Sequence, residues 1–342
     1  MTREAAGQYH NAFHTTIGLT VSIESIRNFI AEDMLAVDRV IRSRLDSEVA
    51  LIRQVSEYII GNGGKRLRPI LVILSSGAFG NQGQARFELA ATIEFIHTAT
   101  LLHDDVVDTS DQRRGKATAN ALFGNAASVL VGDFLYSRAF QMMVGVGIME
   151  VMRTVADATN LIAEGEVLQL LNCHNADIDE ESYLKVIRYK TAKLFEAASR
   201  LGAILGNANR ADIEAMSAYG MHLGTAFQLI DDVLDYSGDM KDTGKNLGDD
   251  LIEGKPTLPL IRALERGTPD QAKLIRSAIE NGGIEEFEAI LAAMKETDAL
   301  EYARDRAKSE AELACQAISG IPDSKFKESL IQLADFAATR NY

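Results

Sequence analysis

Residues 87–108 read FELAATIEFIHTATLLHDDVVD, an apolar segment that ends in a cluster of aspartates. Its aliphatic residues Leu89, Ile93, Ile96 and Leu101 recur at intervals of three to five residues. That spacing is typical of one buried face of an α-helix, whereas a half-buried strand would alternate at every second residue. No sustained alternation of that kind occurs along the chain. The stretch therefore predicts a long helix that carries carboxylates at its C-terminal end.

The same helical spacing extends over most of the 342 residues. No proline occurs between Pro69 and Pro256, and such a gap permits long helices. We predict helices over about 22–60, 69–79, 85–108, 117–143, 149–172, 180–206, 210–237, 256–266, 270–280, 285–318 and 323–340. The stretch 237–255 is rich in Gly, Asp and Lys and predicts a functional loop. These patterns predict one all-α domain over residues 21–342, preceded by a variable N-terminal arm over 1–20.

Composition is that of an ordinary globular protein, with 46% hydrophobic and 25% charged residues. The net charge of −14 argues against a broad nucleic-acid-binding surface, although a local group of cations could still bind a small anion. Cys173 and Cys315 lack zinc-site spacing and are expected to be buried thiols. No apolar run approaches the roughly 18–20 residues that span a bilayer, and no secretion signal is evident. We therefore expect a cytoplasmic protein without a stable membrane anchor.

The acidic helix end at residues 104–108 has a second copy at 231–235, and both read D-D-x-x-D. Positions i, i+1 and i+4 of a helix lie within about 100° of one another, so each copy projects its carboxylates from one side. The six aspartates are Asp104, Asp105, Asp108, Asp231, Asp232 and Asp235. Such a cluster at the negative end of a helix dipole is costly unless cations neutralise it. Oxygen ligands favour Mg²⁺, which also takes substrate phosphates, so the pair predicts a diphosphate bridged by several Mg²⁺ ions.

Basic and polar residues that could hold a diphosphate stand near both motifs. A glycine-rich turn at residues 61–69 carries Lys65, Arg66 and Arg68, and Arg can contact phosphate through two hydrogen bonds. A merely exposed basic loop is the alternative for this turn taken alone. Further candidates along the chain are Arg113, Arg114, Lys190, Thr191, Gln228, Lys245 and Lys255.

Two histidines accompany the first motif. His97 precedes Asp104 by two helical turns and faces nearly the same way, so a ligand contact and a core position are both open for it. His103 points to another face, which favours a structural role. The chain contains neither a G-x-x-x-x-G-K-[ST] loop nor a G-x-G-x-x-G after a strand, so nucleotide hydrolysis and dinucleotide binding are poorly supported.

Taken in order, these motifs resemble the trans-isoprenyl diphosphate synthases, and the likeness extends over about residues 25–340. It rests on the segments 64–69, 104–115, 190–191 and 227–235. Within that family the sequence is most similar to bacterial octaprenyl diphosphate synthases, which make quinone side chains. The resemblance implies an all-α bundle around a deep central cavity, usually as a homodimer. It also implies a prenyltransferase that adds isopentenyl diphosphate repeatedly to an allylic diphosphate such as farnesyl diphosphate.

The resemblance implies a role for each candidate residue. The six motif aspartates would be catalytic and would hold two or three Mg²⁺ ions on the allylic diphosphate. The side chains implied to contact that diphosphate are Arg113, Lys190, Thr191, Gln228, Lys245 and Lys255, with Lys190 also counted as catalytic. Those implied to hold isopentenyl diphosphate are Lys65, Arg68, His97 and Arg114.

Small residues one turn before the first motif bear on product length. Ala99 and Thr100 share the face of Asp104. The resemblance implies that shorter-chain members of the family carry bulky aromatic residues there, which form a floor and stop the product. Small residues there would leave a channel open and imply a long product, although helix packing is an alternative reason for their size. The floor would then lie deeper, among Phe95, Ile96, Phe140 and Met143.

Other functions fit part of the pattern. A shorter-chain geranylgeranyl synthase would share every motif. A terpene cyclase tends to have a single D-D-x-x-D and a different second metal motif. A non-catalytic regulatory subunit would be expected to lack some of the aspartates, which are intact here. A structural helical protein with acidic cation sites would leave Lys65, Arg68, Arg113 and Arg114 unexplained.

Overall fold

The structure, a computed structural model, describes residues 23–61, 64–113, 115–237 and 247–341. The predictions for Arg114, Lys245 and the N-terminal arm therefore lie outside the described residues. Within them helices dominate and there is almost no sheet, which confirms the predicted all-α class. The strands among the described residues are a two-residue antiparallel pair, β1 (Gln112–Arg113) and β2 (Lys116–Ala117), which the sequence patterns did not predict.

The described helices fall into three groups along the chain. The N-terminal group is α2 (Ile23–Phe29), α3 (Ala31–Arg44), α4 (Ala50–Gly61) and α5 (Leu67–Ala78). The central group is α6 (Ala85–Val107), α7 (Ala119–Phe123), α8 (Asn125–Val146), α9 (Met149–Asn172), α10 (Glu180–Ile187), the π-helical turn η1 (Arg188–Ala192), α11 (Lys193–Leu205) and α12 (Arg210–Ser237). The C-terminal group is α14 (Asp249–Ile252), α15 (Leu258–Arg266), α16 (Pro269–Asn281), α17 (Phe287–Glu296), α18 (Ala299–Ala317) and α19 (Lys325–Thr339).

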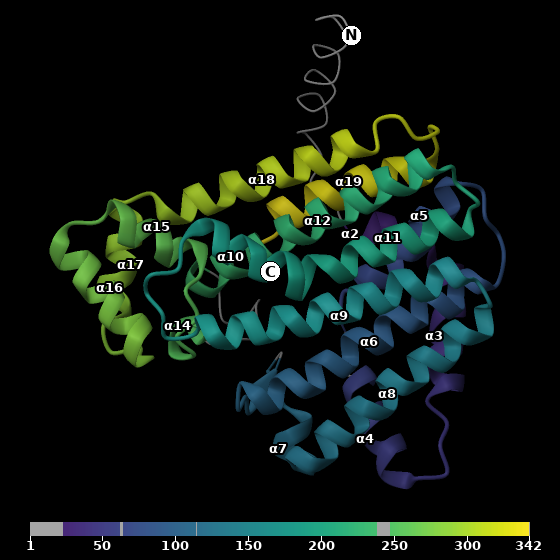
Figure 1. The fold of residues 1–342 in the computed structure, drawn as a ribbon, viewed down its shortest axis with the longest axis horizontal. Coiled ribbons are helices and arrows are strands. Elements are labelled where there is room, and N and C mark those ends of the chain that lie inside the picture. Colours follow the sequence, from purple (N-terminus) through teal and green to yellow (C-terminus); the bar gives the residue numbers. More distant parts are fainter. Residues whose placement is uncertain (1–22, 62–63, 114, 238–246, 342) are drawn as a thin grey trace, which may run out of the picture.

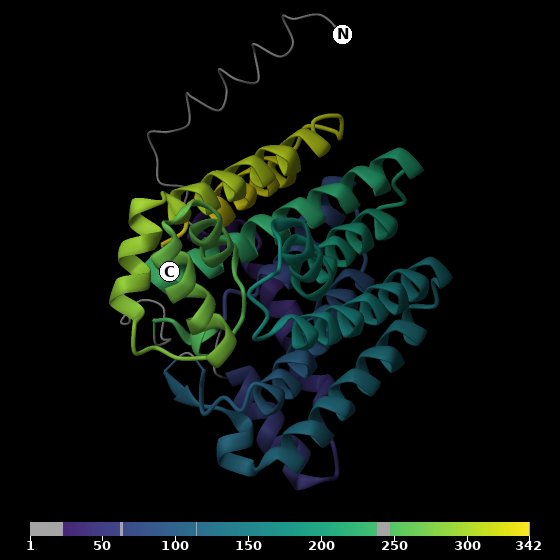
Figure 2. The same ribbon diagram turned by 60° about the vertical axis from the view of Figure 1, so that its left-hand side comes forward.

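The long helices run side by side along the molecule, as Figure 1 shows for α6, α9, α11, α12 and α18. Helix α6 packs on α5 and α8, α11 lies against both α5 and α12, and α18 and α19 cover α12. Aliphatic side chains fill the space between them, and α5 is buried along nearly its whole length. The short helices α14 to α17 form a group at one end, which comes forward in Figure 2. This packing fixes the C-terminal ends of α6 and α12, where the two aspartate motifs lie.

Three predicted helices are interrupted by bends or turns, and a fourth, 180–206, comprises α10, the π-helical turn η1 and α11. The predicted helix 22–60 forms α2, α3 and α4, because the chain bends at Ile30 and because Ser47 accepts a hydrogen bond from the backbone of Val49 in the turn that precedes α4. The predicted helix 117–143 divides at Gly124, whose φ of 86° suits glycine. The predicted helix 285–318 divides at Asp298, which adopts a left-handed conformation with a φ of 52°.

No described helix has the length and apolar character needed to cross a membrane.

Candidate active site

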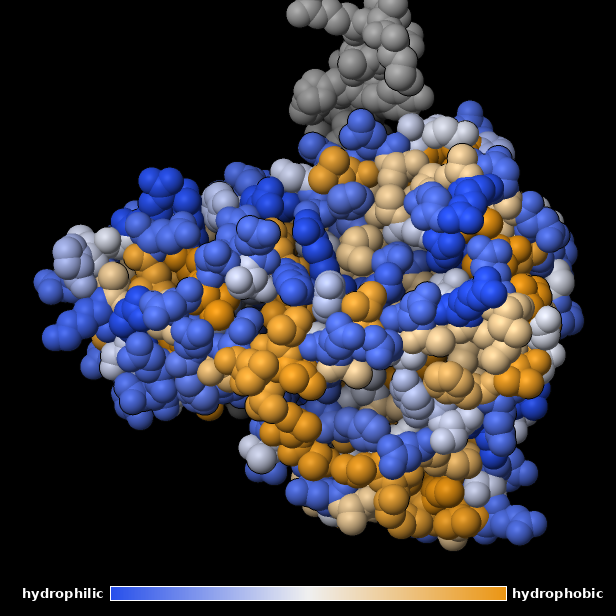
Figure 3. Space-filling view, viewed as in Figure 1, coloured by the Kyte–Doolittle hydropathy of each residue, from blue (hydrophilic) through white to orange (hydrophobic). Residues whose placement is uncertain are grey.

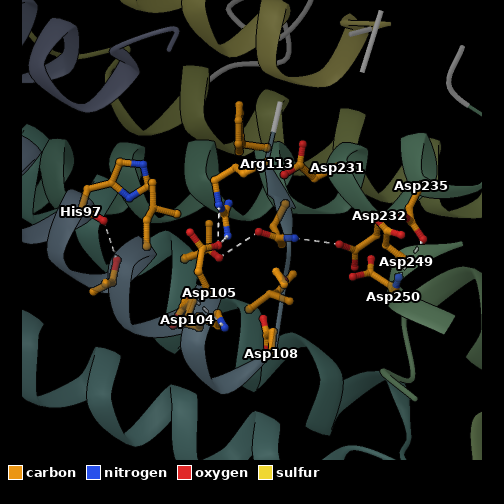
Figure 4. A pocket seen from close by; sticks show the side chains of 18 of the residues that line it. His97, Asp104, Asp105, Asp108, Arg113, Asp231, Asp232, Asp235, Asp249 and Asp250 are labelled. Atoms are coloured by element: carbon orange, nitrogen blue, oxygen red, sulfur yellow. Dashed lines mark hydrogen bonds and ion pairs between the residues drawn. The ribbon is translucent and has the colours of Figure 1, made fainter. Parts of the chain in front are cut away.

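The C-terminal ends of α6 and α12 face one cavity of about 840 Å³, and all six motif aspartates line it. Figure 4 shows the two groups of carboxylates on opposite sides of this cavity. Asp105 and Asp232 are almost fully buried, whereas Asp104, Asp108 and Asp231 are partly exposed. The predicted projection of each triplet from one side of its helix therefore agrees with the structure.

Three cations contact the first motif, from β1, from the π-helical turn η1 and from the loop after α14. Arg113, in β1, donates to Asp105 through Nε at 2.8 Å and through Nη2 at 2.7 Å. Lys255 lies 3.2 Å from Asp108, and Lys190 lies 3.7 Å from Asp104. Burial, and to a smaller extent the charge of Asp108, raises the pKa of Asp104 above its ordinary value, while the positive charges of Lys190, Arg113 and Lys255 oppose that effect. The second oxygen of Asp105 is buried and has no hydrogen-bond partner among the described residues, which leaves it available to an additional cation.

The second motif is held by polar neighbours. Asp232 accepts a hydrogen bond of 2.6 Å from the hydroxyl of Tyr183 and one of 2.8 Å from the amide of Gln228. Burial, together with the charges of Asp250 and Asp231, raises the pKa of Asp232 to about 8. A carboxyl group with so high a pKa is one that a bound cation would stabilise in its charged form.

A π-helical turn presents Lys190 and Thr191 to the cavity. Such turns contain one residue more than an α-helical turn and are frequent at functional sites. Two glycines make room for it: a Cβ at Gly165 of α9 would lie 2.6 Å from the backbone nitrogen of Lys190, and a Cβ at Gly224 of α12 would lie 2.6 Å from the Cα of Ala192. The Thr191 hydroxyl donates to the side-chain oxygen of Gln228 at 2.8 Å. The turn therefore connects both aspartate motifs.

The glycine-rich basic turn forms another wall of the cavity. Arg66 caps α5 in a left-handed conformation and pairs with Glu94 at 2.5 Å. Arg68 lies 3.2 Å from a ring nitrogen of His97 and stacks 4.4 Å from the centre of the Phe195 ring. Lys65, Arg68 and His97 all line the cavity, so the structure brings together the described residues predicted to hold isopentenyl diphosphate.

Three other predicted residues have different surroundings. His103 packs against α8, with a ring nitrogen 3.1 Å from the carbonyl oxygen of Val129, in agreement with its predicted structural role. Thr100 lines the cavity, whereas Ala99 is fully buried and does not. The assignment of Ala99 and Thr100 to product length stays a prediction.

Several cavity residues were not singled out from the sequence. Glu166 on α9 pairs with Lys190 at 2.5 Å, and burial raises its pKa to about 7. Arg340, just after α19, donates to Asp231 at 2.6 Å and lies 3.9 Å from the centre of the Phe227 ring. Tyr183, Asp249 and Asp250 line the cavity near the second motif, and Glu253 lines it beside Lys255. The acids after Gly248 could have been noticed as a third acidic group, whereas Arg340 carries no local sequence signal.

The donor chemistry of the cavity fits Mg²⁺. The acidic side chains that line it offer carboxylate oxygens, the donors that this ion prefers. No three described His, Cys, Asp or Glu side chains converge on one point as a ready-made metal cage. Mg²⁺ does not require one, because it commonly binds through one or two carboxylates and completes its shell with water and substrate phosphates.

Comparison with known proteins places the chain in a family. The sequence profile of the polyprenyl synthetase family matches residues 49–295. Octaprenyl diphosphate synthase of Escherichia coli strain K12 is 53% identical over 322 residues, which cover 94% of this chain and 100% of the relative. The crystal structure of a polyprenyl synthase from Caulobacter crescentus, complexed with calcium and isoprenyl diphosphate, superposes with a TM-score of 0.91 at 43% identity, covering 95% of this chain and 99% of that one. A decaprenyl diphosphate synthase from Rhodobacter capsulatus superposes with a TM-score of 0.88 at 44% identity, covering 94% of this chain and 100% of that one.

The fold and the site thus define an all-α isoprenoid synthase. The chain belongs to the polyprenyl synthetase family, as its motifs indicated. The predicted class of enzyme, a prenyltransferase that makes long-chain trans-polyprenyl diphosphates, is confirmed by these relatives.

Proposed function

We propose that this chain condenses isopentenyl diphosphate repeatedly onto an allylic diphosphate, such as farnesyl diphosphate, to give an octaprenyl chain for quinone side chains. One observation supports this most strongly: two D-D-x-x-D motifs and a separate group of cations line the same cavity. Two diphosphates must lie close together for such a condensation, and the cavity offers a distinct set of contacts for each. A terpene cyclase would need only one diphosphate and would not use the second set.

The allylic diphosphate would lie between the two motifs. That space is lined by Arg113, Lys190, Lys255 and the Thr191–Gln228 pair. Lys245 is expected to contact the same diphosphate. Bound Mg²⁺, in two or three ions on the six aspartates, would neutralise the leaving group. The nearby cations would hold the diphosphate in place and favour its departure, since they act at the point where negative charge develops.

Isopentenyl diphosphate would lie against the basic turn, on Lys65, Arg68 and His97, with Arg114 expected to contribute. Ionisation breaks the allylic C–O bond, and pyrophosphate leaves with the electron pair. The double bond of isopentenyl diphosphate then attacks the allylic carbon, a C–C bond forms, and a proton is lost, for which the released pyrophosphate is a suitable acceptor. Apolar side chains of α6, α9 and α11 would keep water away from the cation.

The growing hydrocarbon would extend past Thr100 and, once side chains move, past Ala99. Both side chains are small, so neither would block a long product. The deeper residues expected to end the channel, Phe95, Ile96 and Met143, are fully buried in the core, and Phe140 packs against it. A long product would therefore need this part of the core to open.

We also propose that the enzyme works as a cytoplasmic homodimer, with residues 21–342 as one catalytic domain and 1–20 as a separate arm. Large apolar side chains are exposed on neighbouring helices: Leu130 and Val144 on α8, and Val167, Leu170 and Leu171 on α9. Figure 3 shows apolar residues gathered over α9 and below it, toward α7 and α8. Apolar surface of this kind is typical of a protein interface, and a second copy would cover it.

The proposed activity is tested by incubating the purified protein with farnesyl diphosphate, labelled isopentenyl diphosphate and Mg²⁺. Label should enter an organic-soluble product, and chelation of the metal should abolish the transfer. Transfer that continues in excess chelator would contradict the metal assignment. Hydrocarbon released from farnesyl diphosphate alone would favour a cyclase.

A further inference from the structure

Glu310 is a buried carboxylate that lies outside the cavity. It stands on α18, its side chain is 5% exposed, and it is absent from the cavity lining. Each of its two oxygens contacts a residue of another element. One lies 2.6 Å from Nδ1 of His222 on α12, and the other accepts a hydrogen bond of 3.2 Å from Arg188.

The two partners keep this carboxylate charged. Burial alone would raise the pKa of Glu310, but the hydrogen bond and charge of His222 and the charge of Arg188 outweigh that effect, and the pKa is lowered. A buried charge is tolerated when it is paired and hydrogen-bonded. Glu310 therefore supplies a fixed negative charge at the junction of α12, α18 and the π-helical turn.

Arg188 links this junction to the active site, because it is the first residue of the π-helical turn. Its carbonyl oxygen accepts a hydrogen bond from the backbone N–H of Lys193, five residues on, and that bond closes the turn. Its guanidinium is held by Glu310. The start of the turn is thus fixed through both its main chain and its side chain.

The position of the turn decides where Lys190 and Thr191 lie. Lys190 reaches Glu166 and Asp104, and Thr191 donates to Gln228, whose amide in turn donates to Asp232. A change of one residue in helical register would rotate these side chains by about 100°, away from the cavity. Gly165 and Gly224 leave room for the wide turn, but they do not hold it in place.

We propose that Glu310 is a positioning residue for the allylic diphosphate: through Arg188 it fixes the π-helical turn that presents Lys190 and Thr191. This inference rests on the proposed function. His222 contributes by orienting the Glu310 carboxylate. The alternative is that Glu310 only joins α18 to α12 and contributes to stability alone. Removal of the carboxylate would weaken the binding of the allylic substrate under the proposal, whereas it would lower only the stability of the fold under the alternative.

The test compares Glu310→Gln with Glu312→Gln, a matched control at an exposed position two residues along the same helix. We expect Glu310→Gln to raise the KM for farnesyl diphosphate about tenfold, because a small displacement of binding groups weakens substrate alignment. The KM for isopentenyl diphosphate should stay within about twofold, since the basic turn lies on other elements. Calorimetric titration with farnesyl diphosphate and Mg²⁺, without isopentenyl diphosphate, should show the same loss of affinity.

A second variant, Arg188→Gln, tests the proposal independently in case Glu310→Gln does not fold. Arg188 is 41% exposed, so Arg188→Gln should fold, and it should reproduce the shift in the farnesyl diphosphate KM. The double variant should be no worse than either single one, because the two residues act as one unit. The proposal would be overturned if the KM values for farnesyl diphosphate and isopentenyl diphosphate changed equally. It would also be overturned if the melting temperature fell while both KM values stayed unchanged. An inactive unmodified enzyme would instead refute the proposed function itself.

Discussion

Replacing Arg340 with alanine should reveal how the second aspartate motif is neutralised before metal binds. The Arg340 side chain is only 3% exposed, and its guanidinium donates to Asp231 and to the carbonyl oxygen of Phe227, at 2.6 Å and 2.9 Å. Removing one member of a buried ion pair costs about 3–5 kcal/mol, and stacking on an aromatic ring adds about 1 kcal/mol. Because the Asp231 side chain is 37% exposed, water compensates for part of this loss. We expect the free energy of unfolding to fall by about 2–3 kcal/mol. For a chain of this length that loss corresponds to a decrease of about 4 °C in melting temperature.

Mg²⁺ should reduce the difference in melting temperature between Arg340→Ala and the unmodified chain. In the unmodified chain the metal competes with Arg340 for Asp231, whereas in Arg340→Ala it supplies the missing positive charge, so the variant should gain more stability from the metal. Melting curves with Mg²⁺ and with chelator measure both effects, and Thr339→Ala, an exposed neighbouring position, is the control. A difference between the Arg340 variant and the unmodified chain that does not respond to Mg²⁺ would refute this account.

Four further predictions concern the site and the proposed dimer. Asp104→Ala and Asp231→Ala should each lower kcat by about 10²–10³-fold with the circular dichroism spectrum unchanged, and a near-normal rate in either would contradict the metal assignment. Since the pKa of Asp232 is raised to about 8, Mg²⁺ binding at pH 7 should release a proton, and the affinity for Mg²⁺ should rise with pH and level off above about 8. Calorimetry in two buffers of different ionisation enthalpy measures the proton release, and Asp232→Asn should abolish it. Ala99→Phe should shorten the product by several isoprene units, and an unchanged product ladder would argue against a role in chain length. Leu171→Glu should convert a dimer to monomers in sedimentation analysis, and a dimer that persists would locate the interface elsewhere.

The sequence predicted the orientation of the two aspartate motifs well because their geometry is local. The three carboxylates of each motif lie within five residues of a helix, so helical periodicity alone decides which way they point. The helices α9 and α12 also begin and end where apolar spacing predicted. Such features depend on neighbours in the chain, which the sequence displays directly.

Other features depend on contacts between distant segments. Arg340 and Asp231 are 109 positions apart, and no local pattern connects them. Glu166 pairs with Lys190 only because Gly165 lets α9 approach the π-helical turn. The break before α18 requires Asp298 to adopt a left-handed conformation that asparagine and aspartate tolerate but do not require. These details follow from tertiary packing, which overrides local preference.

The most direct test of the central claim is the length of the product. Purified protein is incubated with farnesyl diphosphate, isopentenyl diphosphate and Mg²⁺, and the dephosphorylated products are separated by chain length. The two aspartate motifs and the separate basic turn predict a ladder of linear prenyl products, and the 53% identity to an octaprenyl diphosphate synthase leads us to expect that it ends at octaprenol. Products that stop at geranylgeraniol, or a cyclic hydrocarbon in place of a ladder, would contradict this account.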